Sequence, residues 1–165
     1  MPALHEAAQA GNAAEVKVRL SQPGCDVNQL DPGRSTALMW ASMSGDVTTV
    51  KVLIEAKAAV DMSNGNATAL HFAALNGHRG VVDALLEVGA NACIRADGGK
   101  TAADAAREEG HIELAKLLDK AIAAGPPLPG GKAKPTTLEG WIDYFMQDGN
   151  VSLEDATDLA EMEMM

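Results

Sequence analysis

The chain has 165 residues, of which 47% are hydrophobic but only 3% aromatic, and its formal net charge is −10. A chain with this much negative charge is not expected to bind nucleic acid, because such binding depends on Lys and Arg side chains that neutralise phosphates. It has no run of about 18 apolar residues that could span a membrane, its N-terminus lacks the basic and apolar regions of a secretory signal, and Cys25 and Cys93 form no disulfide framework. We therefore expect a protein of the cytoplasm, or of the nucleus as well, that is not secreted and does not bind membranes.

Four similar segments follow one another along the chain: ALHEAAQAGN, TALMWASMSGD, TALHFAALNGH and TAADAAREEGH. Their glycines are 34, 32 and 33 residues apart, at Gly11, Gly45, Gly77 and Gly110. A second apolar segment follows each glycine, and a connection rich in Gly, Asp and Asn (DPGRS, SNGNA or ADGGK) leads to the next copy. A period of this length predicts a solenoid, in which units that cannot bury their apolar faces alone stack on one another.

Each copy predicts two helices joined by a tight turn. Thr36, Thr68 and Thr101 stand where a side-chain oxygen can cap the first helix. The glycine ends that helix in the left-handed conformation, and the polar connection forms a hairpin-like turn towards the next copy.

The pattern TALHFAALNGH, the helix VVDALLEVGAN and the 33-residue period together resemble the ankyrin repeat family over about residues 3–124. The resemblance implies an all-α ankyrin-repeat solenoid with repeats at about 3–30, 31–63, 64–96 and 97–124. The chain departs from the family's pattern at several positions. The proline after the threonine is alanine, the histidine kept as His5 and His71 is replaced by Met39 and Asp104, and Lys57 stands where a helix would end in glycine. We expect these changes to weaken local hydrogen bonding, above all in the second repeat.

No pattern in the sequence indicates catalysis, a cofactor or a metal site. The histidines at 5, 71, 78 and 111 each follow from their place in the repeat. The stretch GPPLPGGKAKP at 125–135 superficially resembles a phosphate-binding loop, but Gly131 stands where that motif needs lysine, so we interpret it as a Pro/Gly-rich linker. We therefore expect a protein that is not an enzyme.

The family resemblance also implies where a partner binds. Ankyrin-like stacks bind proteins through a concave face formed by the hairpin tips and the exposed positions of the first helices. Carried over position by position, the predicted partner-binding residues are Trp40, Met43, Phe72, Leu75, Asn66 and Lys100. An apolar centre with a polar rim is typical of an interaction hot spot. The alternative is that Trp40 and Phe72 only pack between repeats.

Residues 136–165 form an acidic tail with eight acidic residues and no basic one. The tail predicts two short helices. The first has an apolar stripe at helical spacing, made of Leu138, Trp141, Ile142, Phe145 and Met146. Because so short a helix is unstable alone, we expect it to dock, either on the chain's own repeats or in a groove of another protein.

A calcium module is a third interpretation of the tail. The stretch DGNVSLED resembles the second half of an EF-hand loop. However, Tyr144 and Met146 occupy its first and third positions and cannot supply carboxylates, so only a degenerate site at 148–155 could remain.

Taken together, the sequence predicts a protein–protein interaction module, working as an adaptor, a scaffold or an assembly subunit. The alternative is a regulator or inhibitor of an enzyme, a class to which some four-repeat ankyrin proteins belong, although no residue here singles out a target.

Overall fold

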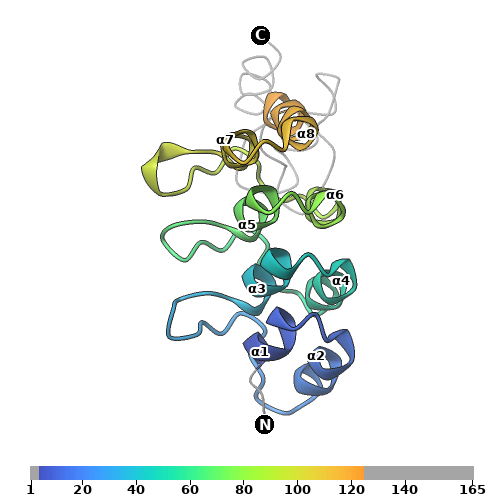
Figure 1. The fold of residues 1–165 in the computed structure, drawn as a ribbon. Coiled ribbons are helices and arrows are strands. Elements are labelled where there is room, and N and C mark those ends of the chain that lie inside the picture. The colour runs from blue at the N-terminus through green and yellow to red at the C-terminus, as the bar shows by residue number, and fades with distance from the viewer. Residues whose placement is uncertain (1–3, 125–165) are drawn as a thin grey trace, which may run out of the picture. The chain divides into compact units, whose positions relative to one another are not determined.

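A computed structural model of the chain describes residues 4–124. This region contains eight α-helices and one short 3₁₀ helix (Figure 1): α1 Leu4–Gln9, α2 Ala13–Leu20, α3 Ala37–Ser44, α4 Val47–Glu55, α5 Ala69–Leu75, α6 Arg79–Glu87, η1 Asp97–Gly99, α7 Ala102–Glu108 and α8 Ile112–Ala123. Two isolated β-bridges, Ser63–Thr68 and Arg95–Thr101, close two of the hairpin turns. The predicted all-α ankyrin-repeat solenoid is confirmed.

The helices stack in two columns (Figure 1). The first helices of the pairs form one column, in which α1 packs on α3, α3 on α5 and α5 on α7. In the second column α2 packs on α4 and α4 on α6. The hairpin loops project from the first column on the side away from the second helices (Figure 1).

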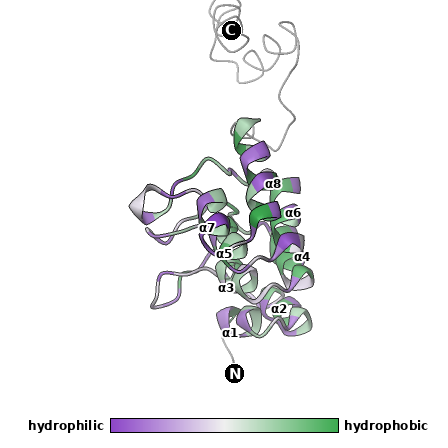
Figure 2. Cartoon of the chain, turned by 45° about the horizontal axis from the view of Figure 1, so that its top comes forward, coloured by the Kyte–Doolittle hydropathy of each residue, from purple (hydrophilic) through white to green (hydrophobic). Residues whose placement is uncertain are grey.

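The two columns of helices bury different kinds of side chain. The first helices bury mainly alanine, which lets neighbouring backbones approach closely, and the second helices bury Val and Leu. Burying one Val or Leu side chain is worth about 1.5–3 kcal/mol. Figure 2 shows these hydrophobic residues on the helices, whereas the hairpin loops are largely hydrophilic.

All three predicted threonines occupy the N-cap positions of their helices, and two of them, Thr36 and Thr101, accept a capping hydrogen bond. The Thr36 hydroxyl accepts a hydrogen bond from the Met39 amide at 3.2 Å, and the Thr101 hydroxyl accepts one from the Asp104 amide at 3.3 Å. At Thr68 the bonding runs the other way, since its amide (3.3 Å) and its hydroxyl (2.9 Å) both donate to Nδ1 of His71.

Where the family's histidine is present, as His5 and His71, it links its repeat to the hairpin that follows. Nε2–H of His71 donates to the Lys100 carbonyl at 3.2 Å, and Nε2–H of His5 donates to the Gln29 carbonyl at 2.8 Å. Met39 replaces this histidine in the second repeat, and its sulfur only accepts a long bond of 3.4 Å from the Thr36 amide. The expected local weakening has its physical origin here, and the softness of the second repeat stays a prediction.

Asp104 replaces the histidine in the fourth repeat. It keeps the interaction with the capping threonine and, within the described residues, lacks the bond to a following hairpin. Its carboxylate accepts from both the amide (3.0 Å) and the hydroxyl (2.8 Å) of Thr101. The Thr101 amide is the main reason that the pKa of Asp104 lies below its usual value. Asp104 thus secures the cap without reaching towards a further hairpin.

The turn glycines form a second link between repeats. Gly45 and Gly77 both have positive φ, at +81° and +70°. A Cβ atom on Gly45 would lie 2.6 Å from the His78 ring, and one on Gly77 would lie 2.5 Å from the ring of His111. Only glycine therefore fits there, because the imidazole of the next repeat covers the turn.

Lys57 adopts the left-handed conformation that glycine holds elsewhere, with φ +66°. The equivalent residue of the next repeat, Gly89, has φ +85°. The sequence thus places a lysine in a left-handed backbone conformation that favours glycine.

The predicted linker at 125–135, the predicted tail at 136–165 and the calcium-like turn at 148–155 lie outside the described residues. The domain boundaries stay predictions. Within residues 4–124, no helix is long and apolar enough to cross a membrane.

Candidate functional site

The four predicted apolar contact residues lie together on α3 and α5, which pack directly against each other. Met43 is 36% exposed and Leu75 is 42% exposed, so both present apolar surface to solvent. Trp40 and Phe72 are half-buried, with one part of each ring packed on the core. Each ring thus packs against the core and also lines a cavity below a hairpin, and its contact with a partner stays a prediction.

Trp40 is fixed in place by the hairpin before it. Its indole Nε1–H donates to Oδ2 of Asp31 at 2.8 Å, while Oδ1 of Asp31 accepts from the Ser35 amide at 2.8 Å. The Ser35 amide is the largest cause, with Trp40 contributing, that holds the pKa of Asp31 below its usual value. A charged Asp31 therefore ties the hairpin to the ring of Trp40.

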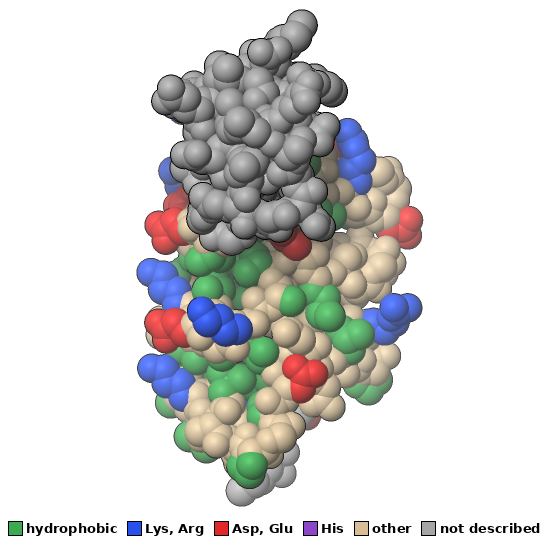
Figure 3. Space-filling view, turned by 180° about the vertical axis from the view of Figure 1, so that it is seen from behind, with side chains coloured by type: hydrophobic (Ala, Val, Ile, Leu, Met, Phe, Trp, Pro, Cys, Tyr) green, Lys and Arg blue, Asp and Glu red, His purple; other side chains and the backbone are tan. Residues whose placement is uncertain are grey.

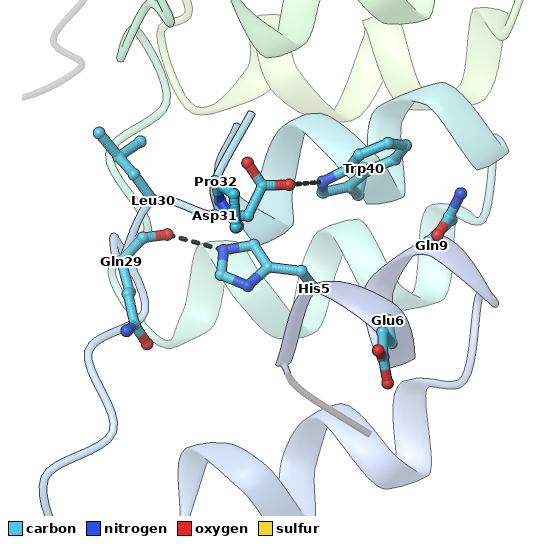
Figure 4. Close-up of a pocket in the computed structure, with 8 residues that line it drawn as sticks. All are labelled: His5, Glu6, Gln9, Gln29, Leu30, Asp31, Pro32 and Trp40. Atoms are coloured by element: carbon cyan, nitrogen blue, oxygen red, sulfur yellow. Dashed lines mark hydrogen bonds between the residues drawn. The ribbon is translucent and has the colours of Figure 1, made fainter. Parts of the chain in front are cut away.

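A cavity of about 360 Å³ lies beside this pair (Figure 4). Its walls are α1, the hairpin and α3, and the residues that line it are His5, Glu6, Gln9, Gln29, Leu30, Asp31, Pro32 and Trp40. Figure 4 shows the hairpin residues on the left, His5 in the centre, and Trp40, Gln9 and Glu6 on the right. We call this the first cavity.

A second cavity of about 210 Å³ lies two repeats further along. It is lined by Ala67, His71, Phe72, Leu75, Ala96, Asp97, Lys100, Ala105 and Glu108. The ammonium group of Lys100 pairs with the Glu108 carboxylate at 2.7 Å. Three predicted contact residues, Phe72, Leu75 and Lys100, thus share one recess.

Asn66 stands apart from both cavities, at an exposed hairpin tip. Its backbone carbonyl accepts a hydrogen bond of 2.7 Å from the Asp97 amide of the next hairpin. The backbone of Asn66 thus joins neighbouring hairpins, and the contact of its side chain with a partner stays a prediction. The tail residues Leu138, Trp141, Ile142, Phe145 and Met146 lie outside the described residues.

The sequence interpretation missed Asp31 and Leu30, and it missed that Glu108 pairs with Lys100. Asp31 could have been found, because the DPG turn places an acceptor shortly before Trp40 and a half-buried indole N–H needs a partner. The ion pair between Lys100 and Glu108 depends on how far the hairpin that carries Lys100 folds back over α7. No local sequence pattern reveals this.

The surface seen from behind carries both signs of charge. Lys and Arg side chains lie next to Asp and Glu along its left edge, with hydrophobic side chains between them (Figure 3). The described region also contains exposed ion pairs, such as Arg79 with Asp83 at 3.5 Å.

Comparison with known proteins gives one family and several relatives. A family model described as ankyrin repeats in three copies matches residues 4–96. A probable E3 ubiquitin-protein ligase of Oryza sativa subsp. japonica, XBOS34, is 36% identical over 140 residues, which are 82% of this chain and 27% of the relative.

Two further relatives carry different names. The palmitoyltransferase Hip14 of Drosophila melanogaster is 39% identical over 92 residues, which are 54% of this chain and 14% of the relative. Ankyrin repeat and SAM domain-containing protein 6 of Mus musculus is 30% identical over 147 residues, which are 81% of this chain and 17% of the relative. The chain thus spans only about a quarter or less of the length of these relatives.

Proposed function

Because the chain belongs to the ankyrin repeat family, we propose that it is an adaptor, scaffold or assembly subunit that binds a protein partner through its concave face. Ankyrin repeats mediate protein–protein interaction and are not a catalytic module. The observation that carries the proposal is the grouping of Trp40, Met43, Phe72 and Leu75 on the adjacent helices α3 and α5, below the hairpin tips.

The packing of the two rings supports this assignment. A ring that is half-buried and hydrogen-bonded, as Trp40 is to Asp31, has lost its side-chain freedom before a partner arrives. Binding then needs less ordering of the surface, which favours affinity. Large aromatic anchors surrounded by polar groups are also where binding energy concentrates.

Several features support a protein as the partner, in preference to nucleic acid or a membrane. The chain has a formal net charge of −10, and its surface mixes both signs where Figure 3 shows it. A cytoplasmic location belongs to the same proposal, and the free, exposed thiol of Cys25 supports it, since reducing compartments maintain such thiols.

A second candidate function is the regulation of an enzyme. The names of two relatives, an E3 ubiquitin-protein ligase and a palmitoyltransferase, favour it, because a segment similar to this chain lies within those larger enzymes. In that case the concave face would hold a substrate or a catalytic subunit for an enzyme, and the chain itself would still perform no chemistry.

A double substitution on the concave face tests the proposal. Full-length wild type and the Trp40→Ala, Phe72→Ala variant are used to capture partners from cells, and the affinity for the strongest captured protein is measured by calorimetry. We expect a loss of roughly 30-fold or more, since hot-spot truncations cost about 2 kcal/mol or more.

The matched control removes two apolar side chains elsewhere. Val18 is 52% exposed on α2 and Ile112 is 48% exposed at the start of α8. The Val18→Ala, Ile112→Ala variant should keep wild-type affinity, and both variants should melt cooperatively by circular dichroism. Equal affinity of all three proteins would show that the partner does not use the concave face.

The tail can be tested in the same assay. The Trp141→Ala, Phe145→Ala variant alters the predicted apolar stripe while the full chain is kept. A partner lost on substitution identifies the tail as a binding motif, and a partner gained identifies it as a cover of the chain's own repeats.

A further inference from the structure

The second cavity lies where the two preceding repeats carry a large ring. The residue after the family's histidine position is Trp40 in the second repeat, Phe72 in the third and Ala105 in the fourth. Ala105 lines the second cavity from α7, as Trp40 lines the first cavity from α3. Because α7 contains no aromatic residue, the series of rings along the first helices ends at Phe72 and a recess takes the place of the next one.

The polar partner of the ring is missing together with the ring. In the first cavity the indole of Trp40 donates to Asp31, whose backbone amide donates to the Ser35 carbonyl across the hairpin. The equivalent backbone bond of the later hairpin runs from the amide of Ala96 to the Lys100 carbonyl. The second cavity thus has alanine in both places, and its hairpin wall offers no side-chain acceptor for a polar ring.

The polar side chains that line the second cavity are already bonded within the chain. Nδ1 of His71 lies 2.9 Å from the Thr68 hydroxyl, and its Nε2–H donates to the Lys100 carbonyl at 3.2 Å. Oδ1 of Asp97 accepts from the amide of the following residue at 2.9 Å. The Lys100 ammonium pairs with the Glu108 carboxylate at 2.7 Å, and both side chains are about half exposed. Because these two charges neutralise each other, the recess is complementary to an uncharged occupant.

The remaining walls of the second cavity are apolar. They are made of Ala67, Phe72, Leu75, Ala96 and Ala105. Leu75 is 42% exposed, and Met43 on the adjacent α3 extends the apolar surface towards the centre of the concave face. The volume of about 210 Å³ lies below the roughly 300–1,000 Å³ that is typical of small-molecule pockets. The recess therefore suits one side chain better than a metabolite or a cofactor.

We propose that the second cavity receives one large apolar side chain of the protein partner, such as Phe, Leu or Met, in the place of the ring that α7 lacks. This inference rests on the proposed function, because it assumes that a protein occupies the concave face. The anchor, as we call this side chain, packs on Phe72 and Leu75, and the pair of Lys100 and Glu108 lies beside it. An apolar anchor in a pocket with a polar rim is where binding energy concentrates in protein interfaces.

Short random peptides displayed on phage serve as the probe and are selected on the full-length protein. In each enriched peptide the large apolar residues are replaced one at a time by alanine, and affinities are measured by calorimetry. Ala105→Phe fills the second cavity from α7 with the ring that the two preceding repeats carry. The matched control, Ala14→Phe, adds the same ring at an exposed position of α2. The Trp40→Ala, Phe72→Ala variant reports whether a peptide uses the concave face.

We expect one apolar residue of the peptide whose replacement weakens binding to wild type by about tenfold or more, as the loss of a buried side chain predicts. Ala105→Phe should weaken the unaltered peptide by a similar factor, and replacing the anchor should then cost little. Ala14→Phe should bind every peptide as wild type does.

A second variant keeps the test valid if the added ring disturbs the fold, which circular dichroism melts of Ala105→Phe would reveal. Leu75→Ala removes a wall side chain that is largely exposed, so it leaves the core intact. Side chains in contact are energetically coupled. Replacing the anchor should therefore cost several-fold less on Leu75→Ala than on wild type.

The failures of the two ideas are distinguishable. If the peptides depend on Trp40 and Phe72 but bind a folded Ala105→Phe as tightly as wild type, the pocket assignment is overturned and the concave-face function stands. The same holds if replacing each apolar residue costs as much on Leu75→Ala as on wild type. If no enriched peptide depends on Trp40 or Phe72, both the pocket and the proposed function are overturned.

Discussion

Replacing Ser42 by alanine should stabilise the protein. Ser42 lies in α3 with 0% of its surface exposed, and within the described residues its hydroxyl has no hydrogen-bond partner. The equivalent residues of the neighbouring first helices, Ala8 and Ala74, are also completely buried and carry no polar atom. A buried hydroxyl without a partner costs about 1–3 kcal/mol. We therefore expect Ser42→Ala to raise the free energy of unfolding by about that amount.

Urea unfolding followed by far-UV circular dichroism measures the effect. With a slope of about 1–3 kcal/mol per molar urea, the midpoint should rise by roughly 0.5–1.5 M without a change in slope. The matched control is Ser44→Ala in the same helix, where the hydroxyl donates to the Ala41 carbonyl at 3.0 Å. Both substitutions gain the small helix preference of alanine. Ser44→Ala also gives up a hydrogen bond, so only Ser42→Ala should raise the midpoint beyond that preference.

The result that would refute this reasoning is a Ser42→Ala midpoint equal to that of Ser44→Ala, or below it. The Ser42 hydroxyl would then have a partner in solution, and its burial would carry no penalty.

Three further substitutions test the links within and between repeats. Lys57→Gly should raise the free energy of unfolding by about 0.5–1 kcal/mol, because relief of left-handed strain outweighs the entropy that glycine adds to the unfolded chain; an unchanged urea midpoint would contradict it. Burial holds the pKa of His71 below its usual 6.5, so the folded chain favours neutral imidazole and loses stability as the pH falls below that value. Thermal melts above and below pH 6.5 should show this loss in wild type and a smaller one in His71→Gln, whereas equal losses would exclude His71 as its cause. Gly77→Ala and Gly110→Ala carry similar left-handed strain, but only the first meets a ring, that of His111, so its urea midpoint should indicate about 1–3 kcal/mol of additional destabilisation.

The fold could be predicted from the sequence because its determinants are local and recur. The threonine caps, the turn glycines and the apolar helix faces each act within a few residues, and the period repeats them. Even the departures followed this logic, since the sequence identified Lys57 as a residue in a glycine's place and the backbone there is left-handed.

The site was less predictable, because its geometry depends on contacts between repeats. Position in the repeat placed Trp40 and Phe72 on the concave face, and it could not show how far each ring sinks between its neighbours. The bond from Trp40 to Asp31 depends on the path of the hairpin, and the lack of a partner for the Ser42 hydroxyl depends on everything packed around it. Such features follow only from the assembled stack.

Met39 has a consequence for how the hairpins move relative to one another. His5 and His71 each donate a hydrogen bond to the hairpin that follows, whereas a thioether has no hydrogen to donate. The middle hairpin, around residues 63–68, thus lacks a histidine bond of this kind and keeps the bond from the Asp97 amide to the Asn66 carbonyl. Its amides should exchange with solvent faster than those of its neighbours, since segments with fewer bonds open at lower cost. A partner that binds the hairpin tips would meet two hairpins held in place by histidine bonds. Between them it would meet one hairpin that can move to fit the partner.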